Sequence, residues 1–104
     1  MTRVIYDLEG CSLRAEGHAG AGTKGEDIVC AALSILNWTL ISAAEEFNLH
    51  LFLDEKNGIS EVWCDPEEKD EERCRFLFDT MAAGYQMLGE RFPEHVHFEG
   101  GKDG

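Results

Sequence analysis

The sequence predicts an α/β (α+β) fold in which two long helices pack on one mixed β-sheet. Short stretches of alternating apolar and polar residues occur in pairs that turns connect, which is typical of β-hairpins. Two longer stretches repeat apolar residues at the spacing of an α-helix. Strand pairs that alternate with helices favour a layered fold, here in the order ββαββαβ.

The first strand pair is expected over residues 3–9 and 12–17. Val4 and Tyr6 fall on the same side of the first strand, because side chains alternate along a strand, and the chain turns around Gly10. These two strands are therefore expected to form a hairpin with one apolar face.

A long helix is expected over residues 26–46, where Glu26 and Asp27 place carboxylates at the positive end of the helix dipole. Apolar residues cover more than half of its circumference, which is more than one face of a sheet can bury. We therefore expect a second surface on this helix, and a homodimer that covers it.

The rest of the chain repeats the pattern of two strands and a helix, and the Asn57-Gly58 pair is a strong signal for a hairpin turn. The expected elements are strands over residues 48–53 and 59–64, a helix over residues 67–91 and a short strand over residues 94–98. A chain of 104 residues has room for one core. We expect a single domain over residues 1–98 and a flexible tail over residues 99–104.

The charge balance limits the kind of partner. Nine Lys and Arg residues against 21 Asp and Glu residues give a net charge of −12. That charge argues against a surface that binds the phosphates of a nucleic acid, and it disfavours an anionic membrane surface. A basic protein is the partner that it attracts.

The expected location is the cytoplasm. The first ten residues contain no apolar segment typical of a signal peptide, and polar residues interrupt the apolar stretch at residues 28–44. The four cysteines form no Cys-x-x-Cys pair, so the sequence favours neither a zinc knuckle nor a thioredoxin-type site.

The candidate catalytic residues are His18 and Cys30, which lie on either side of a glycine-rich loop. A cysteine attacks as its thiolate, which the field at a helix N-terminus stabilises. A histidine within hydrogen-bond reach can take the thiol proton and return it to the leaving amine. Backbone amides from Glu26 to Ile28 could bind the oxyanion. The small residues of the loop could cover a bound peptide, and they include Ala19, Gly20, Gly22 and Gly25.

Each of these residues also has a purely structural interpretation. Cys30 could be a small apolar residue on a buried helix, and His18 an exposed polar residue at a strand end. Asp27 could orient His18 or simply favour the start of the helix. Ser34 could support the site or bond back to a helix carbonyl.

Other chemistry-bearing residues give weaker signals. His95 and His97 alternate on the last strand, which is more typical of a solvated strand face than of a metal site. Cys11, Cys64 and Cys74 have no visible catalytic partner and fit filler positions. We expect no metal and no cofactor.

Residues 17–34 read G-H-A-G-A-G-T-K-G-E-D-I-V-C-A-A-L-S. This stretch resembles the signature G-H-A-G … G-x-D-I-V-C-A-A-V-S of the ribosomal-processing cysteine protease family, Prp (YsxB-like), with Leu33 where valine is usual. The likeness extends more loosely over the whole chain in length, element order and acidic character. Ala21, Gly22 and Thr23 make an unusually small loop, which bears on substrate preference more than on chemistry.

The resemblance implies a small homodimeric bacterial cysteine endopeptidase. Proteins of this family remove an N-terminal extension from a large-ribosomal-subunit protein around the time of ribosome assembly. The family's catalytic residues match His18 and Cys30, and its flanking aspartate and serine match Asp27 and Ser34. The expected substrate is therefore the precursor of a basic ribosomal protein.

Two other functions remain open at this point. A non-catalytic acidic module that binds a basic ribosomal protein would need neither His18 nor Cys30. A thiol redox protein would need a resolving cysteine close to Cys30 in sequence, and the chain has none there.

Overall fold

The computed structural model describes the backbone of residues 1–17, 24–56 and 58–100, and the side chains of these residues except 24–27. Its described strands form one mixed sheet in the order β3-β4-β2-β1-β5. The strands are β1 (Thr2–Asp7), β2 (Ser12–Glu16), β3 (Leu51–Lys56), β4 (Ile59–Cys64) and β5 (Val96–Gly100). The helices are α1 (Lys24–Glu46), a short 3-10 helix η1 (Glu68–Asp70) and α2 (Glu71–Arg91). The predicted fold class and the order ββαββαβ are confirmed.

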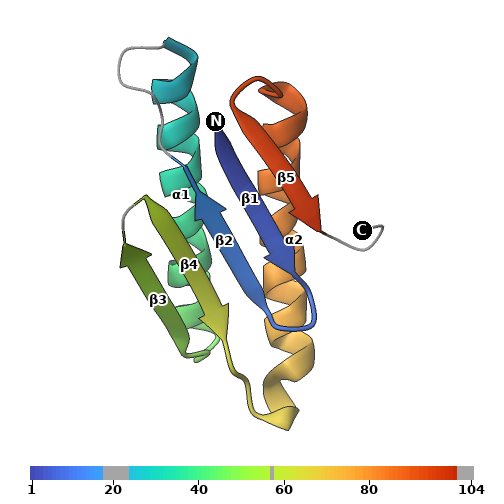
Figure 1. Cartoon of the computed structure of the whole chain (residues 1–104). Coiled ribbons are helices and arrows are strands. Elements are labelled where there is room, and N and C mark those ends of the chain that lie inside the picture. Colours follow the sequence, from blue (N-terminus) through green and yellow to red (C-terminus); the bar gives the residue numbers. More distant parts are fainter. Residues whose placement is uncertain (18–23, 57, 101–104) are drawn as a thin grey trace.

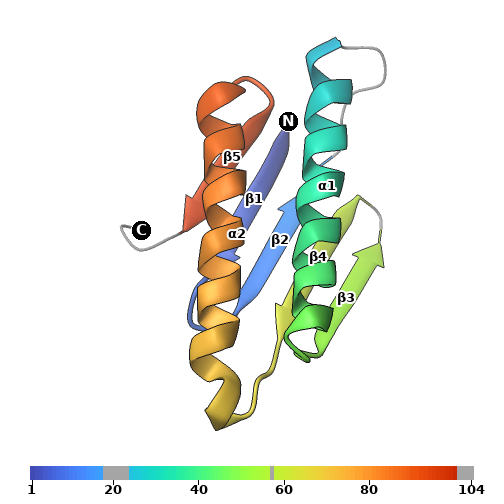
Figure 2. The same ribbon diagram turned by 180° about the vertical axis from the view of Figure 1, so that it is seen from behind.

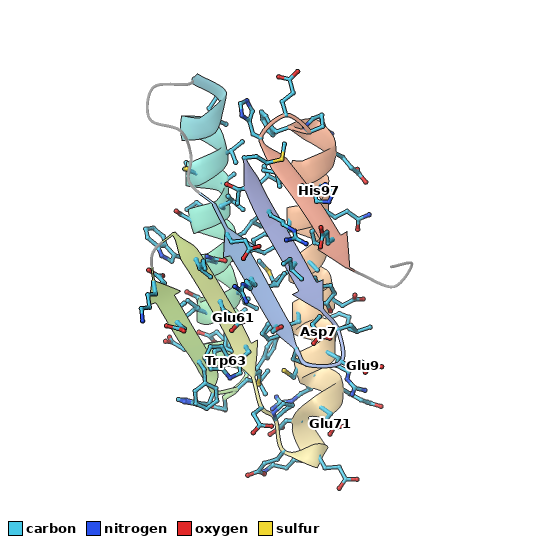
Figure 3. All side chains as sticks on the ribbon, viewed as in Figure 1. Asp7, Glu9, Glu61, Trp63, Glu71 and His97 are labelled. Atoms are coloured by element: carbon cyan, nitrogen blue, oxygen red, sulfur yellow. The ribbon has the colours of Figure 1, made fainter. Side chains whose placement is uncertain are left out.

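Both long helices cover the same face of the sheet, and the other face is open (Figures 1 and 2). β1, β2, β4 and β3 pair in antiparallel fashion, whereas β5 pairs in parallel with β1. Figure 3 shows Glu61 and Trp63 of β4 on the open face. Val62 and Cys64, which alternate with them, are buried beneath the helices. The core is therefore a single layer between sheet and helices.

Helix α1 meets this core along one stripe. Val29, Leu40 and Ala44 are at most 1% exposed, whereas Ile28 and Ile35 are more than half exposed. By length and composition alone, Ile28–Glu46 could cross a membrane, with a mean hydropathy of 1.6. One side of this helix instead packs against the sheet, and its opposite side remains apolar and open in the single chain.

Several boundaries differ from the sequence prediction, each for a local reason. Strand β3 begins at Leu51 and not at residue 48, because the backbone N–H of Leu49 donates to the carbonyl of Ala44 and closes the end of α1 at 2.8 Å. Strand β5 begins at Val96, because the backbone N–H groups of His95 and Val96 donate to the carbonyl of Phe92 in the turn after α2.

The other differences shift the ends of elements by one to four residues. β1 ends at Asp7, whose side chain accepts a hydrogen bond from the N–H of Gly10 in the turn. The expected helix over residues 67–91 is divided into η1 and α2. Strand β5 includes Glu99 and Gly100, so these two residues do not belong to the expected tail, and residues 101–104 lie outside the described part.

Gly17 ends β2 in a conformation that only glycine adopts easily. Its φ is +111°, and a Cβ at this position would collide with the main-chain oxygen of Met1. Its N–H donates to the carbonyl of Gly58 at 3.1 Å and ties the end of β2 to the turn between β3 and β4. The chain therefore leaves the sheet toward α1 from a fixed point.

We predict that Gly17→Ala lowers the free energy of unfolding by about 1–3 kcal/mol. The alanine would have to adopt a positive φ, and its Cβ would collide with the main-chain oxygen of Met1. Gly89→Ala in α2 is the matched control, since a Cβ there meets Phe98 at an ordinary 3.4 Å. Chemical denaturation of both variants is the measurement. Equal stability of the two variants would contradict this role for Gly17.

Candidate active site

A groove with a volume of about 460 Å³ lies between one face of α1, from Cys30 to Asn37, and one end of the sheet. Cys30, Ser34 and Asn37 line it from α1. Ala15 and Ser60 line it from β2 and β4, and they are direct partners in the sheet register. The rest of the lining comes from both sides of the same region and consists of Thr2, Gly17, Leu33, Glu55, Lys56, Gly58 and Ile59. The groove therefore opens beside the candidate nucleophile.

The helical repeat explains why one wall of the groove is polar. Cys30, Ser34 and Asn37 are spaced by four and three residues, so they share one face of α1. This face borders the buried stripe of Val29 and Leu40. Burial of that stripe against the sheet turns the polar face toward the groove.

The side chain of Asn37 is hydrogen-bonded to a residue of the core. The hydroxyl of Tyr85, which is completely buried in α2, donates a hydrogen bond to the Oδ1 atom of Asn37. Burial raises the pKa of Tyr85 far above its usual value, so the hydroxyl stays protonated and able to donate. This bond joins α2 to the wall of the groove.

The four thiols differ in their surroundings. Cys30 is partly exposed, whereas the other three are buried. Burial raises the pKa of Cys64 and that of Cys74, and it therefore opposes formation of their reactive thiolates. The filler positions expected for Cys11, Cys64 and Cys74 are thus confirmed, and Cys30 is the thiol that a solute can reach.

Several predicted site residues lie outside what the structure describes. His18, Ala19, Gly20 and Gly22 belong to residues 18–23. Asp27 lies in the first turns of α1, and its side chain is not among those described.

One predicted loop residue is placed differently. The helix begins at Lys24, two residues earlier than expected, so Gly25 belongs to the first turn of α1 and not to the loop. This prediction for Gly25 is therefore wrong. The earlier start places Cys30 in the second turn of the helix.

Asn37, Ser60 and Tyr85 were not among the site residues predicted from the sequence. The spacing of Asn37 from Cys30 and Ser34 was a usable signal, because it continues one helical face. Ser60 and Tyr85 come from other elements, and nothing in their local sequence marks them as neighbours of the groove.

His97 pairs with Glu99 at 3.3 Å on the open sheet face. Among the side chains described, no group of three His, Cys, Asp or Glu residues is placed to hold a metal ion.

Comparison with known proteins identifies the family of this chain. The family model for the cysteine protease Prp matches residues 1–97. The chain belongs to the Prp family. It is therefore a cysteine protease, and the non-catalytic module and the thiol redox protein are set aside. Among curated proteins, none matches at a significant level.

Solved structures share the fold. SMU.848 from Streptococcus mutans is 31% identical, with a TM-score of 0.70 over 94% of this chain and 90% of that one. A Prp from Staphylococcus aureus, described as an essential ribosomal processing protease in complex with a substrate peptide, is 18% identical with a TM-score of 0.73. The same protein with a covalently linked product peptide is 21% identical with a TM-score of 0.72. Both S. aureus comparisons cover 94% of this chain and 95% of the other.

We predict that iodoacetamide at neutral pH alkylates Cys30 well before the three buried thiols, because Cys30 is partly exposed and burial opposes thiolate formation at Cys64 and Cys74. Peptide mapping by mass spectrometry at short times measures the site. Cys30→Ala is the control and should remove the fast phase. Equal labelling of all four cysteines in the folded protein would contradict this assignment.

Proposed function

We propose that this Prp-family protease removes the N-terminal extension of a basic large-subunit ribosomal protein, with Cys30 as nucleophile and His18 as general base and acid. The observation that supports it best is the position of Cys30. It is the partly exposed thiol, it lines the groove, and it lies in the stretch that resembles the family signature. The S. aureus relative, described as a ribosomal processing protease, supports this substrate class.

The reaction divides into two acyl transfers. His18 takes the thiol proton, and the Cys30 sulfur attacks the peptide carbonyl to form a tetrahedral oxyanion. The C–N bond then breaks as His18 protonates the leaving amine, and a thioester remains on Cys30. Water, deprotonated by His18, hydrolyses the thioester and restores the thiol. Asp27 orients His18 in this scheme, and Ser34 is a neighbouring hydroxyl on the same helix face as Cys30.

Backbone amides at the start of α1 would stabilise the oxyanion. A helix that begins at Lys24 leaves its first amides without intrahelical acceptors, and the helix dipole adds positive potential there. Ala19, Gly20 and Gly22 are small enough to let a peptide approach and to fold over it. This machinery uses no metal or cofactor.

The net charge of −12 fits a basic substrate, because opposite charge accelerates encounter. We propose the cytoplasm as the location, where the thiol would stay reduced.

We predict that Cys30→Ser and His18→Ala each abolish cleavage of a peptide that spans the extension junction of the host's precursor, because each removes one partner of the proton transfer. Mass spectrometry of the products measures cleavage, and circular dichroism confirms folding. Cys64→Ala is the matched control, since it removes a buried thiol and should retain activity. Turnover by Cys30→Ser at the wild-type rate would reject the mechanism.

We also propose that the active protein is a homodimer that joins through the helix layer. Ile28, Ile35 and Trp38 of α1 are 57–65% exposed, and Met87 of α2 is 55% exposed. Between the two helices lies an apolar groove of about 530 Å³. Its lining includes Ala31, Ile35, Leu36, Gly84, Met87 and Leu88. A second copy would cover these side chains and remove apolar surface from water.

We predict that Trp38→Glu converts the dimer into a monomer at micromolar concentration, because the dimer would have to bury an unpaired carboxylate. Sedimentation equilibrium measures the mass. Phe52→Glu, which changes an exposed apolar residue of β3 on the open sheet face, is the control and should remain dimeric. A wild-type protein with the mass of one chain would refute the dimer.

A further inference from the structure

We propose that Asn37 is a substrate-binding residue whose side-chain amide donates hydrogen bonds to the peptide backbone in the groove, and that Tyr85 is the positioning residue that holds this amide. The inference rests on the proposed function. It adds a subsite for the substrate backbone at a fixed distance from the nucleophile.

The distance between Cys30 and Asn37 follows from the geometry of α1. Asn37 lies seven residues after Cys30 on the same face of α1, so the helical rise of about 1.5 Å per residue separates them by about 10 Å. An extended peptide covers that length in about three residues. Both side chains line the same groove, so a peptide whose scissile bond is at Cys30 can extend along the wall to Asn37.

Tyr85 determines which part of the amide faces the groove. Its buried hydroxyl donates to Oδ1 of Asn37, which fixes the orientation of the side-chain amide. The Nδ2 group retains two N–H donors, and no hydrogen bond joins it to another residue in the described part of the chain. The core therefore uses the acceptor of Asn37 and leaves its donors for a ligand.

The opposite wall carries a second unused polar group. The Oγ atom of Ser60 is buried and has no hydrogen-bond partner among the described residues. A buried hydroxyl without a partner costs free energy, which a ligand that bonds to it can recover. An extended peptide presents carbonyl and N–H groups in alternation, so its backbone can satisfy Asn37 and Ser60.

A purely structural role for Asn37 makes a different prediction. In that case Asn37 serves only to accept the hydrogen bond of Tyr85, since a buried tyrosine hydroxyl needs a partner. Asn37→Asp separates the two roles. The carboxylate still accepts from Tyr85, but it has no N–H groups to donate to a peptide.

The experiment measures kcat and KM of the full-length protein on a synthetic peptide that spans the extension junction of the host's ribosomal protein precursor. We expect Asn37→Asp to lower kcat/KM about tenfold, mainly through KM, because a hydrogen bond to the bound peptide is lost and carbonyl oxygens face a carboxylate. The added negative charge alone would strengthen the attraction of a basic substrate. A lower kcat/KM would therefore reflect the lost N–H donors and not the change in net charge. The rate of Cys30 alkylation by iodoacetamide should stay unchanged, which shows that the thiol and the fold are intact.

A matched control lies on the same helix. Thr39 is exposed, and its hydroxyl bonds back to the carbonyl of Ile35 at 2.7 Å. Thr39→Ala should therefore leave kcat/KM at the wild-type value.

A double-mutant cycle tests the role of Tyr85. Tyr85→Phe should raise KM a few-fold in the wild-type background, since Asn37 loses its orientation. In the Asn37→Ala background the same substitution should leave KM unchanged. A structural effect of Tyr85 would change KM equally in both backgrounds, and that result would overturn its assignment as a positioning residue.

The outcomes separate this inference from the proposed function. Cleavage by the wild type together with a tenfold loss in Asn37→Asp supports the inference. Equal kcat/KM for the wild type and Asn37→Asp overturns it and leaves the proposed function intact. If the wild type does not cleave the junction peptide, the proposed substrate is wrong and the inference is overturned with it.

Discussion

The rotation of α1 about its own axis is the constraint on which the active site depends. Val29 and Leu40 are almost completely buried against the sheet, and they fix that rotation. Successive helical residues point about 100° apart, so Cys30, next to Val29, lies at the edge of the contact and is partly exposed. Helix α2 packs closely beside α1, since a Cβ on Gly84 would approach Leu36 to 2.7 Å. Any roll of α1 would therefore disturb both contacts and displace the thiol.

Burial also decides which thiol can react. Cysteine packs well in an apolar core, and three of the four cysteines do so. Burial of a thiol in the core can raise its pKa, and it does so for Cys64 and Cys74. The nucleophile must instead lie where water, substrate and the field of the helix start can reach it. The border of the α1 contact meets that requirement, whereas the centre of the core does not.

The fold could be predicted from the sequence because each element depends on local patterns. Alternation in β1 and the Asn57-Gly58 pair identify the hairpins, and burial of Val4 and Tyr6 agrees with the predicted face. Element ends were less accurate, since they depend on hydrogen bonds such as Leu49 to Ala44. The candidate nucleophile was identified from a contiguous motif. The contact of Tyr85 with Asn37 joins residues 48 positions apart, and no local pattern predicts such a pair.

The net charge of the molecule acts on a partner at long range, whereas individual side chains of the groove act at short range. The acidic segment at residues 67–72 includes η1, which lies at the opposite end of the molecule from the start of α1 (Figure 1). Figure 3 shows Glu71 at that same end, with Asp7 and Glu9 on the sheet side of it. Long-range attraction needs only net charge, so these carboxylates can draw in a basic protein without touching the scissile bond. In the proposed reaction, alignment of that bond with Cys30 needs short, directional contacts, which the side chains of Asn37 and Ser60 in the groove are able to make.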